Sequence, residues 1–380
     1  MSGEYTLIVK LPPEGTLLRD LVVTSLAYIR EFGYDQNVEV SFEGSAVKIS
    51  AQSRDTILDL FKGLYREAAH VADAKSERIR LGILLNDQRI LSRLLKREVK
   101  GLTYLDAIRD FLYAHASTDL DLSSLKDVEV RDRGIKLGQG NFATINPLVS
   151  ERYEHGLEFW RLNYERKLEV LLNEEWYALT LAGFAFATAS FIDGDLLMVY
   201  LPEHFVASEV PEKLLKALGE VHGPHSLQKK VNKIVYEEQH PAEPFSAFVL
   251  LVSLNLVKGA ENSPVLYAHR YSLPLALCKL RRANNVFTML EKKQAELFDT
   301  LRFAARLMKE GVELVEELIR VARRTLSLRL GAEFTIYNRF CNLLLQSIQG
   351  AYSPYEVAYY GARNGLMSYS LVKGIISALS

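Results

Sequence analysis

Residues 5–64, YTLIVKLPPEGTLLRDLVVTSLAYIREFGYDQNVEVSFEGSAVKISAQSRDTILDLFKGL, decide the fold class of the first part of the chain. Three short segments are rich in apolar residues and read as strands, namely residues 5–10, 38–42 and 46–51. The stretches between and after them, Leu17–Phe32 and the segment that follows Ser53, carry apolar residues at helical spacing. Ser53 is the expected cap of the second helix. Strand, helix, strand, strand, helix is most of a ferredoxin-like unit. We expect its remaining strand at Arg80–Leu85.

The middle of the chain contains an uncharged stretch, Trp176–Ile192, which is short for a membrane span. Asp193-Gly194, a strong hairpin signal, follows it and precedes a second apolar run at residues 196–201. We therefore expect a buried β-hairpin and no membrane association. Five of the eleven prolines fall between Pro202 and Pro244 and indicate a link.

The last part of the chain has the pattern of packed helices. Apolar residues between Leu297 and Ala322 recur in alternating steps of three and four, with an interruption at Gly311. The sequence thus predicts an α+β protein with three regions: an α/β N-terminal region (1–130), a middle β-containing region with a proline-rich link (131–244) and an α-helical bundle (245–380).

Charge is distributed unevenly along the chain, although the net charge is only −1. Residues 245–380 hold 17 Lys and Arg against 10 Asp and Glu, whereas residues 1–244 hold 29 against 37. A basic rear behind an acidic front suits a surface that faces a polyanion. Chance asymmetry balanced by internal salt bridges remains the alternative.

The basic candidates for nucleic-acid contact lie in two parts of the sequence. Arg302, Arg306 and Lys309 are spaced for one helix face, and an arginine face can match phosphates. The complete set of basic candidates is Lys229, Lys230, Lys233, Arg281, Arg282, Arg302, Arg306, Arg320, Arg323 and Arg324. The alternative is a solvated face that nearby glutamates neutralise, namely Glu313, Glu316 and Glu317.

Residues 131–148, RDRGIKLGQGNFATINPL, read as a polar loop punctuated by glycines. Lys136, Gln139 and Asn141 are side chains that can hydrogen-bond base edges. An ordinary surface loop is the competing interpretation.

Catalytic and metal motifs are sparse. The sequence has no P-loop, HExxH or GxSxG motif, and its two cysteines, Cys278 and Cys341, cannot form a four-thiolate zinc site. His222 and His225 could be metal ligands, but ordinary loop histidines are the simpler reading. We expect no cofactor and, because the start MSGEYTLIVK lacks a signal-peptide pattern, a soluble cytoplasmic protein.

One catalytic pattern stays open as an alternative. Arg109 and His115, in RDFLYAH, match the Arg-to-His spacing of the HEPN ribonucleases, which cut RNA without metal. Asp110 directly follows the arginine and would oppose a phosphate.

Four segments together resemble a known family: GNFATINPL (140–148), GLEFWRLNYERKLEVLL (156–172), LTLAGFAFATASFIDGDLLMVYLP (179–202) and NRFCNLLLQSIQGAYSPYEVAYYGARNGL (338–366). In order and size the chain resembles the large subunit of archaeal type I-A CRISPR interference complexes, the Cascade-type assemblies of antiviral defense. Some large subunits carry a cysteine zinc site, and this chain departs from that pattern.

The resemblance implies a subunit that binds DNA and RNA and is not an enzyme. Such a subunit contacts the guide RNA 5′ handle, reads the protospacer-adjacent motif of the target double-stranded DNA and helps recruit the helicase-nuclease. Its other partners are the backbone, handle-binding and small subunits. Guide pairing reads the target sequence, so the protein reads only the motif and the backbone. A scaffold for another multiprotein assembly is a third possibility.

Overall fold

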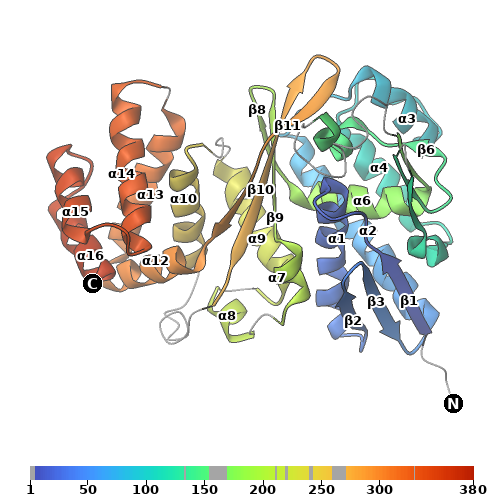
Figure 1. Cartoon of the computed structure of the whole chain (residues 1–380), viewed down its shortest axis with the longest axis horizontal. Helices are drawn as coiled ribbons and strands as arrows, with labels where there is room; N and C mark the ends of the chain where they lie inside the picture. The colour runs from blue at the N-terminus through green and yellow to red at the C-terminus, as the bar shows by residue number, and fades with distance from the viewer. Residues whose placement is uncertain are drawn as a thin grey trace. The chain divides into compact units, whose positions relative to one another are not determined.

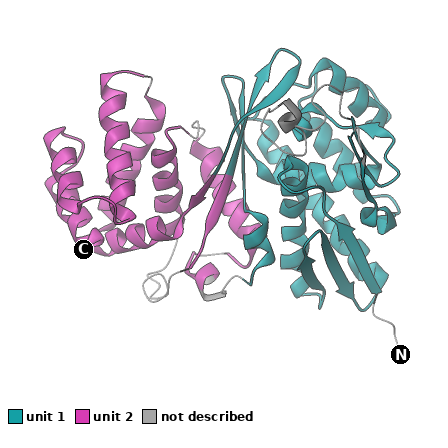
Figure 2. Ribbon diagram, viewed as in Figure 1, with its two compact units in different colours: residues 1–209, 277–293 teal, residues 210–276, 294–380 magenta. Residues whose placement is uncertain are grey.

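The computed structural model describes residues 5–131, 134–153, 169–209, 212–218, 221–238, 243–258, 271–328 and 330–380. Helices dominate it and three small sheets accompany them, which confirms the α+β class (Figure 1). The chain forms two compact units (Figure 2): unit 1 comprises residues 1–209 and 277–293, and unit 2 comprises residues 210–276 and 294–380. These two units are a different division from the three regions expected from the sequence, whose boundaries were placed at residues 130/131 and 244/245. Within the described ranges, no helix is long and apolar enough to cross a membrane.

The expected strand–helix–strand–strand–helix unit is present at the start of unit 1. Its strands are β1 (Tyr5–Lys10), β2 (Glu39–Glu43) and β3 (Ala46–Ala51), and its helices are α1 (Leu17–Tyr34) and α2 (Arg54–Ser76). The antiparallel sheet has the order β1-β3-β2. Ser53 begins α2 as expected, because its hydroxyl accepts the amide of Thr56 at 3.2 Å.

The fourth strand of a ferredoxin-like sheet does not form at Arg80–Leu85. This segment makes only one isolated bridge, between Gly82 and Thr103. Its backbone acceptors are used elsewhere: the carbonyl of Leu81 accepts the amide of Tyr104 at 2.8 Å, and that of Gly82 accepts Arg282 at 3.0 Å. The 3₁₀ turn η1 (Leu122–Lys126) packs beside β1 instead.

Helices α3 (Leu85–Leu95), α4 (Tyr104–Ala116) and α6 (Glu174–Ala187) complete the helical layer of unit 1. Helix α6 packs against α1, α2 and α4, and every residue from Glu175 to Ala187 is buried. The hairpin expected at Trp176 therefore begins only at Thr188. A helix buried on all sides loses the polar face that would reveal its period, so residues 176–187 gave no helical signal.

The expected hairpin turn is confirmed at Asp193-Gly194, where both residues have positive φ, 52° and 85°. It joins β8 (Thr188–Ile192) to β9 (Asp195–Tyr200) in a sheet of order β11-β10-β9-β8. Strands β10 (Pro274–Ala283) and β11 (Val286–Glu296) lie in the part expected to be wholly helical. The apolar run at Leu275–Cys278 and the turn at Asn284, with φ 55°, explain the difference.

A third sheet and two short helices complete unit 1. The sheet comprises β4 (Val128–Arg131), β5 (Gly134–Leu137), β6 (Phe142–Ala143) and β7 (Glu169–Leu172), in the order β4-β5-β7-β6. The helices are the 3₁₀ element η2 (Asn146–Tyr153) and α7 (Glu203–Ala207). Residues 154–168, which hold most of the segment 156–172, lie outside the described ranges.

Unit 2 is a helical bundle, as expected for the rear of the chain. Its helices are α8 (Glu212–Ala217), α9 (Pro224–Glu238), α10 (Phe245–Lys258), α12 (Phe298–Glu310), α13 (Val312–Ser327), α14 (Ala332–Ile348), α15 (Pro354–Arg363) and α16 (Tyr369–Leu379). Helix α10 is the central one and packs against α9, α12, α13 and α14. The expected break at Gly311 separates α12 from α13. Residues 354–379 form two separate helices, α15 and α16.

Candidate nucleic-acid interface

A row of basic side chains covers the exposed face of α3. Arg89 and Arg93 of the helix and Lys96, the left-handed residue that ends it with φ 54°, are exposed and spaced four and three residues apart. The opposite face of the helix buries Leu91 and Leu94. Among the described residues, no carboxylate pairs with the three basic side chains. We call Arg89, Arg93 and Lys96 the α3 row.

The one acidic residue of α3 is turned inward. The side chain of Asp87 is buried, where it accepts the hydroxyl of Tyr104 at 2.5 Å and the amide of Asn146 at 2.8 Å. The same carboxylate raises the pKa of Tyr104, after the larger effect of burial. The inward position of Asp87 leaves the outer face of the helix basic.

The expected polar loop is shorter than the sequence suggested. Lys136 lies half-buried in strand β5, because residues 134–137 pair with β4 and β7. Gln139 and Asn141 are exposed between β5 and β6. Gly140 holds this loop against β7: a Cβ there would lie 2.6 Å from the backbone carbon of Leu171. The two amide side chains are therefore presented by a backbone with little freedom.

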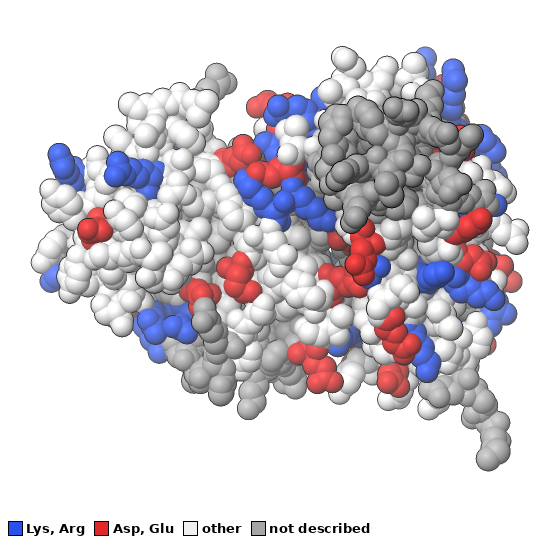
Figure 3. All heavy atoms as spheres, in the orientation of Figure 1, with Lys and Arg blue, Asp and Glu red and all other residues white. Residues whose placement is uncertain are grey.

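The α3 row and this loop share one surface of unit 1. The guanidinium carbon of Arg93 lies 5.4 Å from the ring centroid of Phe142, the residue that follows Asn141. Helix α3 and strand β6 are neighbours, as Figure 1 shows. Basic side chains also line the edge over α3 in Figure 3. Cations for phosphates and amides for base edges thus lie together.

Sequence reasoning missed the α3 row, although a local signal existed. Residues 78–100 hold seven Lys and Arg and two Asp and Glu, inside a front that is acidic as a whole. The total over 244 residues concealed this cluster. Counting charge over windows of about 20 residues would have found it.

The lysines of α9 were expected in a link but lie on a helix. The ammonium of Lys230 donates to the carbonyl of Leu218, and Lys233 lies 3.8 Å from Glu237. Lys229 lies on the same helix and also has an interaction partner. Helix α9 can form there because Pro224 is its first residue, where proline is tolerated.

Most of the remaining arginine candidates are already paired within the protein. Arg323 binds Glu238 through two nitrogens and Arg324 lies 2.9 Å from Glu333, while Arg306 donates to the carbonyl of Ala378 at 3.2 Å. In unit 1, Arg281 makes a bidentate pair with Asp195 at 2.7 and 2.9 Å, and Arg282 donates to Gly82. Both lie on strand β10 and not on a helix.

Two candidates of the rear, Arg302 and Arg320, have no ion pair or hydrogen bond with the described residues. Two of the three glutamates expected to neutralise the arginine face form their direct contacts with other residues. Glu316 pairs with Lys258, and Glu317 accepts the amide and hydroxyl of Ser368 at the start of α16. Part of the rear face is therefore neutralised, and the direct ion pairs of Arg323 and Arg324 are with Glu238 and Glu333.

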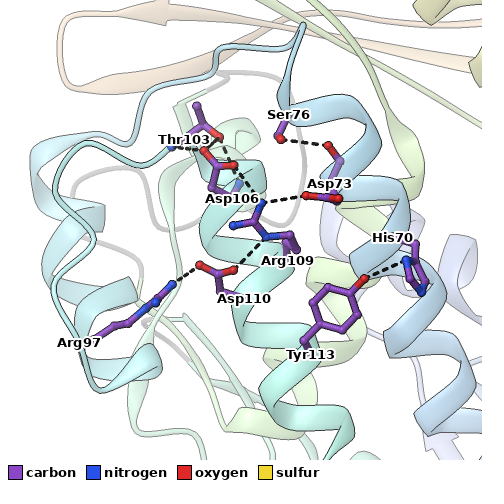
Figure 4. Close-up of polar contacts among 9 residues, drawn as sticks. All are labelled: His70, Asp73, Ser76, Arg97, Thr103, Asp106, Arg109, Asp110 and Tyr113. Carbon is purple, nitrogen blue, oxygen red and sulfur yellow. Dashed lines mark hydrogen bonds and ion pairs between the residues drawn. The ribbon is translucent and has the colours of Figure 1, made fainter.

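Arg109 and His115 do not form a joint site. Figure 4 shows the guanidinium of Arg109 among three carboxylates, with Asp73 and Asp110 at 2.9 Å and Asp106 at 3.5 Å. The hydrogen bond that Arg109 donates to the carboxylate of Asp110 is the main reason that the pKa of Arg109 is raised. His115 is buried, and its Nε2 lies 3.0 Å from Oε2 of Glu175. The positive charge is thus neutralised, and the imidazole is engaged inside the core.

The described residues contain no group of three or more His, Cys, Asp or Glu side chains that could hold a metal ion. Cys278 and Cys341 are buried free thiols, and burial raises the pKa of Cys341 to about 12. His222 is exposed whereas His225 is buried at the start of α9.

Comparison with known proteins assigns the chain to no group. No family model matches the sequence, and no curated protein matches it either.

Proposed function

We propose that this chain is a non-catalytic, nucleic-acid-binding subunit of a CRISPR effector complex, resembling the type I-A large subunit. The observation that supports this most directly is the α3 row beside Gln139 and Asn141. Phosphates would lie along the row, and base edges would meet the two amides.

The dimensions of the α3 row suit a nucleic-acid backbone. The four-residue step from Arg89 to Arg93 advances about 6 Å along the helix, close to the spacing of successive phosphates, and Lys96 adds a third cation at the end of the helix. Arginine binds phosphate in a fork and keeps its charge at any cellular pH. The guanidinium of Arg93 lies over the ring of Phe142. This contact limits the conformations of the Arg93 side chain, so less side-chain entropy is lost when it binds a phosphate.

Within such a complex, the duplex that carries the protospacer-adjacent motif is the natural ligand of this surface. One well-placed amide–base contact discriminates by about 1–3 kcal/mol, which is enough to select a short motif. The guide RNA 5′ handle, the other effector subunits and the helicase-nuclease are proposed partners on the strength of the sequence resemblance alone.

The HEPN ribonuclease alternative has less support. A phosphodiester at Arg109 would meet Asp73, Asp106 and Asp110, and the resulting repulsion opposes binding. His115 would have to leave Glu175 and the core to reach it.

The proposal is tested by fluorescence anisotropy with labelled duplex DNA at several salt concentrations. Arg89→Ala and Arg93→Ala should each weaken binding about equally for all sequences. They should also flatten the slope of log K against log salt by about one. Arg66→Ala, at an exposed arginine of α2 in the same unit, is the matched control and should behave as wild type.

The proposed reading of base edges by Gln139 and Asn141 is tested by selecting bound sequences from a pool of randomised duplex DNA. The wild-type chain should enrich a short motif, and Gln139→Ala or Asn141→Ala should reduce this enrichment without changing the salt slope. If Arg89→Ala and Arg93→Ala bind DNA with the same affinity and salt slope as the control Arg66→Ala, the α3 row does not contact DNA. A binding loss only on Lys230→Ala would move the site to α9, and RNA cleavage abolished by His115→Ala would favour the ribonuclease.

A further inference from the structure

The exposed face of α15 is unusual in its composition. The helix turns Val357, Ala358 and Gly361 inward. Its outer side forms what we call the tyrosine face: Tyr352 just before the helix, then Tyr355, Glu356, Tyr359 and Arg363. Tyr355 and Tyr359 are 68% and 66% exposed, which is high for aromatic residues one helical turn apart. Tyr369 of the adjacent helix α16 is also exposed.

Tyrosine at this exposure is a mark of protein–protein contact. Its ring covers a large area at low entropic cost, and its hydroxyl can both donate and accept a hydrogen bond. Interface cores are enriched in tyrosine and arginine and depleted of other charges. Much of the unit 2 surface seen in Figure 3 is neither acidic nor basic.

A nucleic-acid ligand fits this face poorly. Residues 332–380 contain three Lys and Arg and two Asp and Glu, so they offer almost no net positive charge. Affinity for a phosphate backbone rests on several cations that displace counterions. The stacking capacity of the tyrosines is present, but the charge that normally accompanies it is absent.

The two charges of the face identify its partner. Glu356 lies at the start of α15 and Arg363 at its end, seven residues apart and therefore on the same side of the helix. Both are exposed, and neither has an ion pair or hydrogen bond with the described residues. In an antiparallel pair of identical helices, each Glu356 would face the Arg363 of the other copy, and Tyr359 would lie near the two-fold axis.

We infer that the tyrosine face binds a second copy of this chain, with the two α15 helices antiparallel. A two-fold interface uses the same residues on both sides, so opposite charges at the two ends of one helix satisfy each other twice. Antiparallel helices also align their dipoles favourably. The inference goes beyond the proposed nucleic-acid function and concerns the other unit.

Sedimentation velocity of the full-length chain between about 1 and about 100 µM tests this, since small interfaces give weak complexes. The sedimentation coefficient should rise with concentration. Glu356→Arg or Arg363→Glu alone places like charges opposite each other twice and should raise the dimer Kd about tenfold or more. The double reversal restores both pairs with their signs exchanged and should recover wild-type association. Tyr359→Ala should weaken association in either background.

Two controls isolate the face. Reversal of the exposed pair Lys233–Glu237 on α9, in the same unit, should leave association unchanged. Arg89→Ala should weaken DNA binding and leave association unchanged, so failure of one proposal is distinguishable from failure of the other. Circular dichroism checks that each variant is folded.

Three outcomes would overturn the inference. The wild-type chain could remain monomeric over the whole range. The single charge reversals could weaken association without rescue by the double reversal, which would mean that Glu356 and Arg363 face other residues of the second copy. The face could instead bind single-stranded DNA, with Tyr355→Ala abolishing that binding and no self-association observed.

Discussion

Lys75 shows how one side chain can join two elements of unit 1. It lies at the end of α2 and is buried. Its ammonium donates to the carbonyls of Ala185 at 2.8 Å, Phe186 at 3.1 Å and Thr188 at 2.5 Å. These carbonyls belong to the end of α6 and the start of β8, where a helix leaves acceptors unsatisfied. Burial lowers the pKa of Lys75 to about 7.

This pKa makes the free energy of unfolding depend on pH. The unfolded chain keeps its lysine protonated up to a pH of about 10.4, whereas the folded chain releases the proton near pH 7. The unfolded state therefore binds more protons between these values, and stability should rise with pH by up to about 1.4 kcal/mol per unit. Lys75→Met should remove this rise, which denaturant unfolding from pH 6 to 10 would measure.

Lys62→Met is the matched control, because Lys62 lies on the same helix and is only half-buried. It should keep the wild-type pH dependence. Equal slopes for wild type and Lys75→Met would show that the three carbonyl partners keep Lys75 charged throughout.

At the residue scale, the sequence predicted features that neighbouring residues determine. Ser53 was recognisable as a helix cap and Asp193-Gly194 as a turn, because each depends on a few adjacent positions. The burial of Lys75 and Asp87 was not recognisable, since both are charged and their partners lie far away in the sequence. Arg109 and His115 fit a motif by spacing alone, and spacing did not reveal the carboxylates around them.

Among the elements, α6 gave the least information in the sequence, yet it packs very closely against α1. Its crossing with α1 depends on Gly183, where a Cβ would lie 1.9 Å from the carbonyl oxygen of Leu21. Ser25 donates to the carbonyl of Leu179 at 2.7 Å in the same contact. The two backbones meet with no space for a side chain, which an apolar run cannot disclose.

Gly183→Ala should therefore destabilise the protein by about 1–3 kcal/mol, because α1 and α6 must separate. The gain in helix propensity, about 1 kcal/mol, offsets only part of this. Gly63→Ala on α2 is the control: its Cβ would meet only the Tyr28 hydroxyl at 3.1 Å, the end of a side chain that can move. Denaturant midpoints compare the two, and equal effects would show that α1 and α6 separate easily.

In the whole molecule, the net charge summed over residues 1–244 and over residues 245–380 was a poor guide to which cations are available for binding. The acidic first part of the chain contains the basic α3 row. In the basic rear, three arginines already bind groups of the protein itself, namely Glu238, Glu333 and the carbonyl of Ala378. The net charge of a long segment indicates only the average electrostatic field around it, whereas binding depends on which cations remain unpaired at one surface. Only the folded chain identifies those cations, which is why the bundle was predictable and its unpaired arginines were not.

The arginines of unit 2 should therefore divide into two classes if the bundle also meets nucleic acid. Arg302→Ala and Arg320→Ala remove unpaired cations, and each should flatten the salt slope of DNA binding by about one. Arg323→Ala and Arg324→Ala remove cations whose charge Glu238 and Glu333 already offset, so the slope should stay close to that of wild type. Anisotropy titrations of the full-length chain measure all four. If all four variants keep the wild-type slope, the bundle makes no phosphate contact through these residues and DNA binding belongs to unit 1. If Arg323→Ala or Arg324→Ala flattens the slope as much as the others, the pairs with Glu238 and Glu333 must open to bind phosphate.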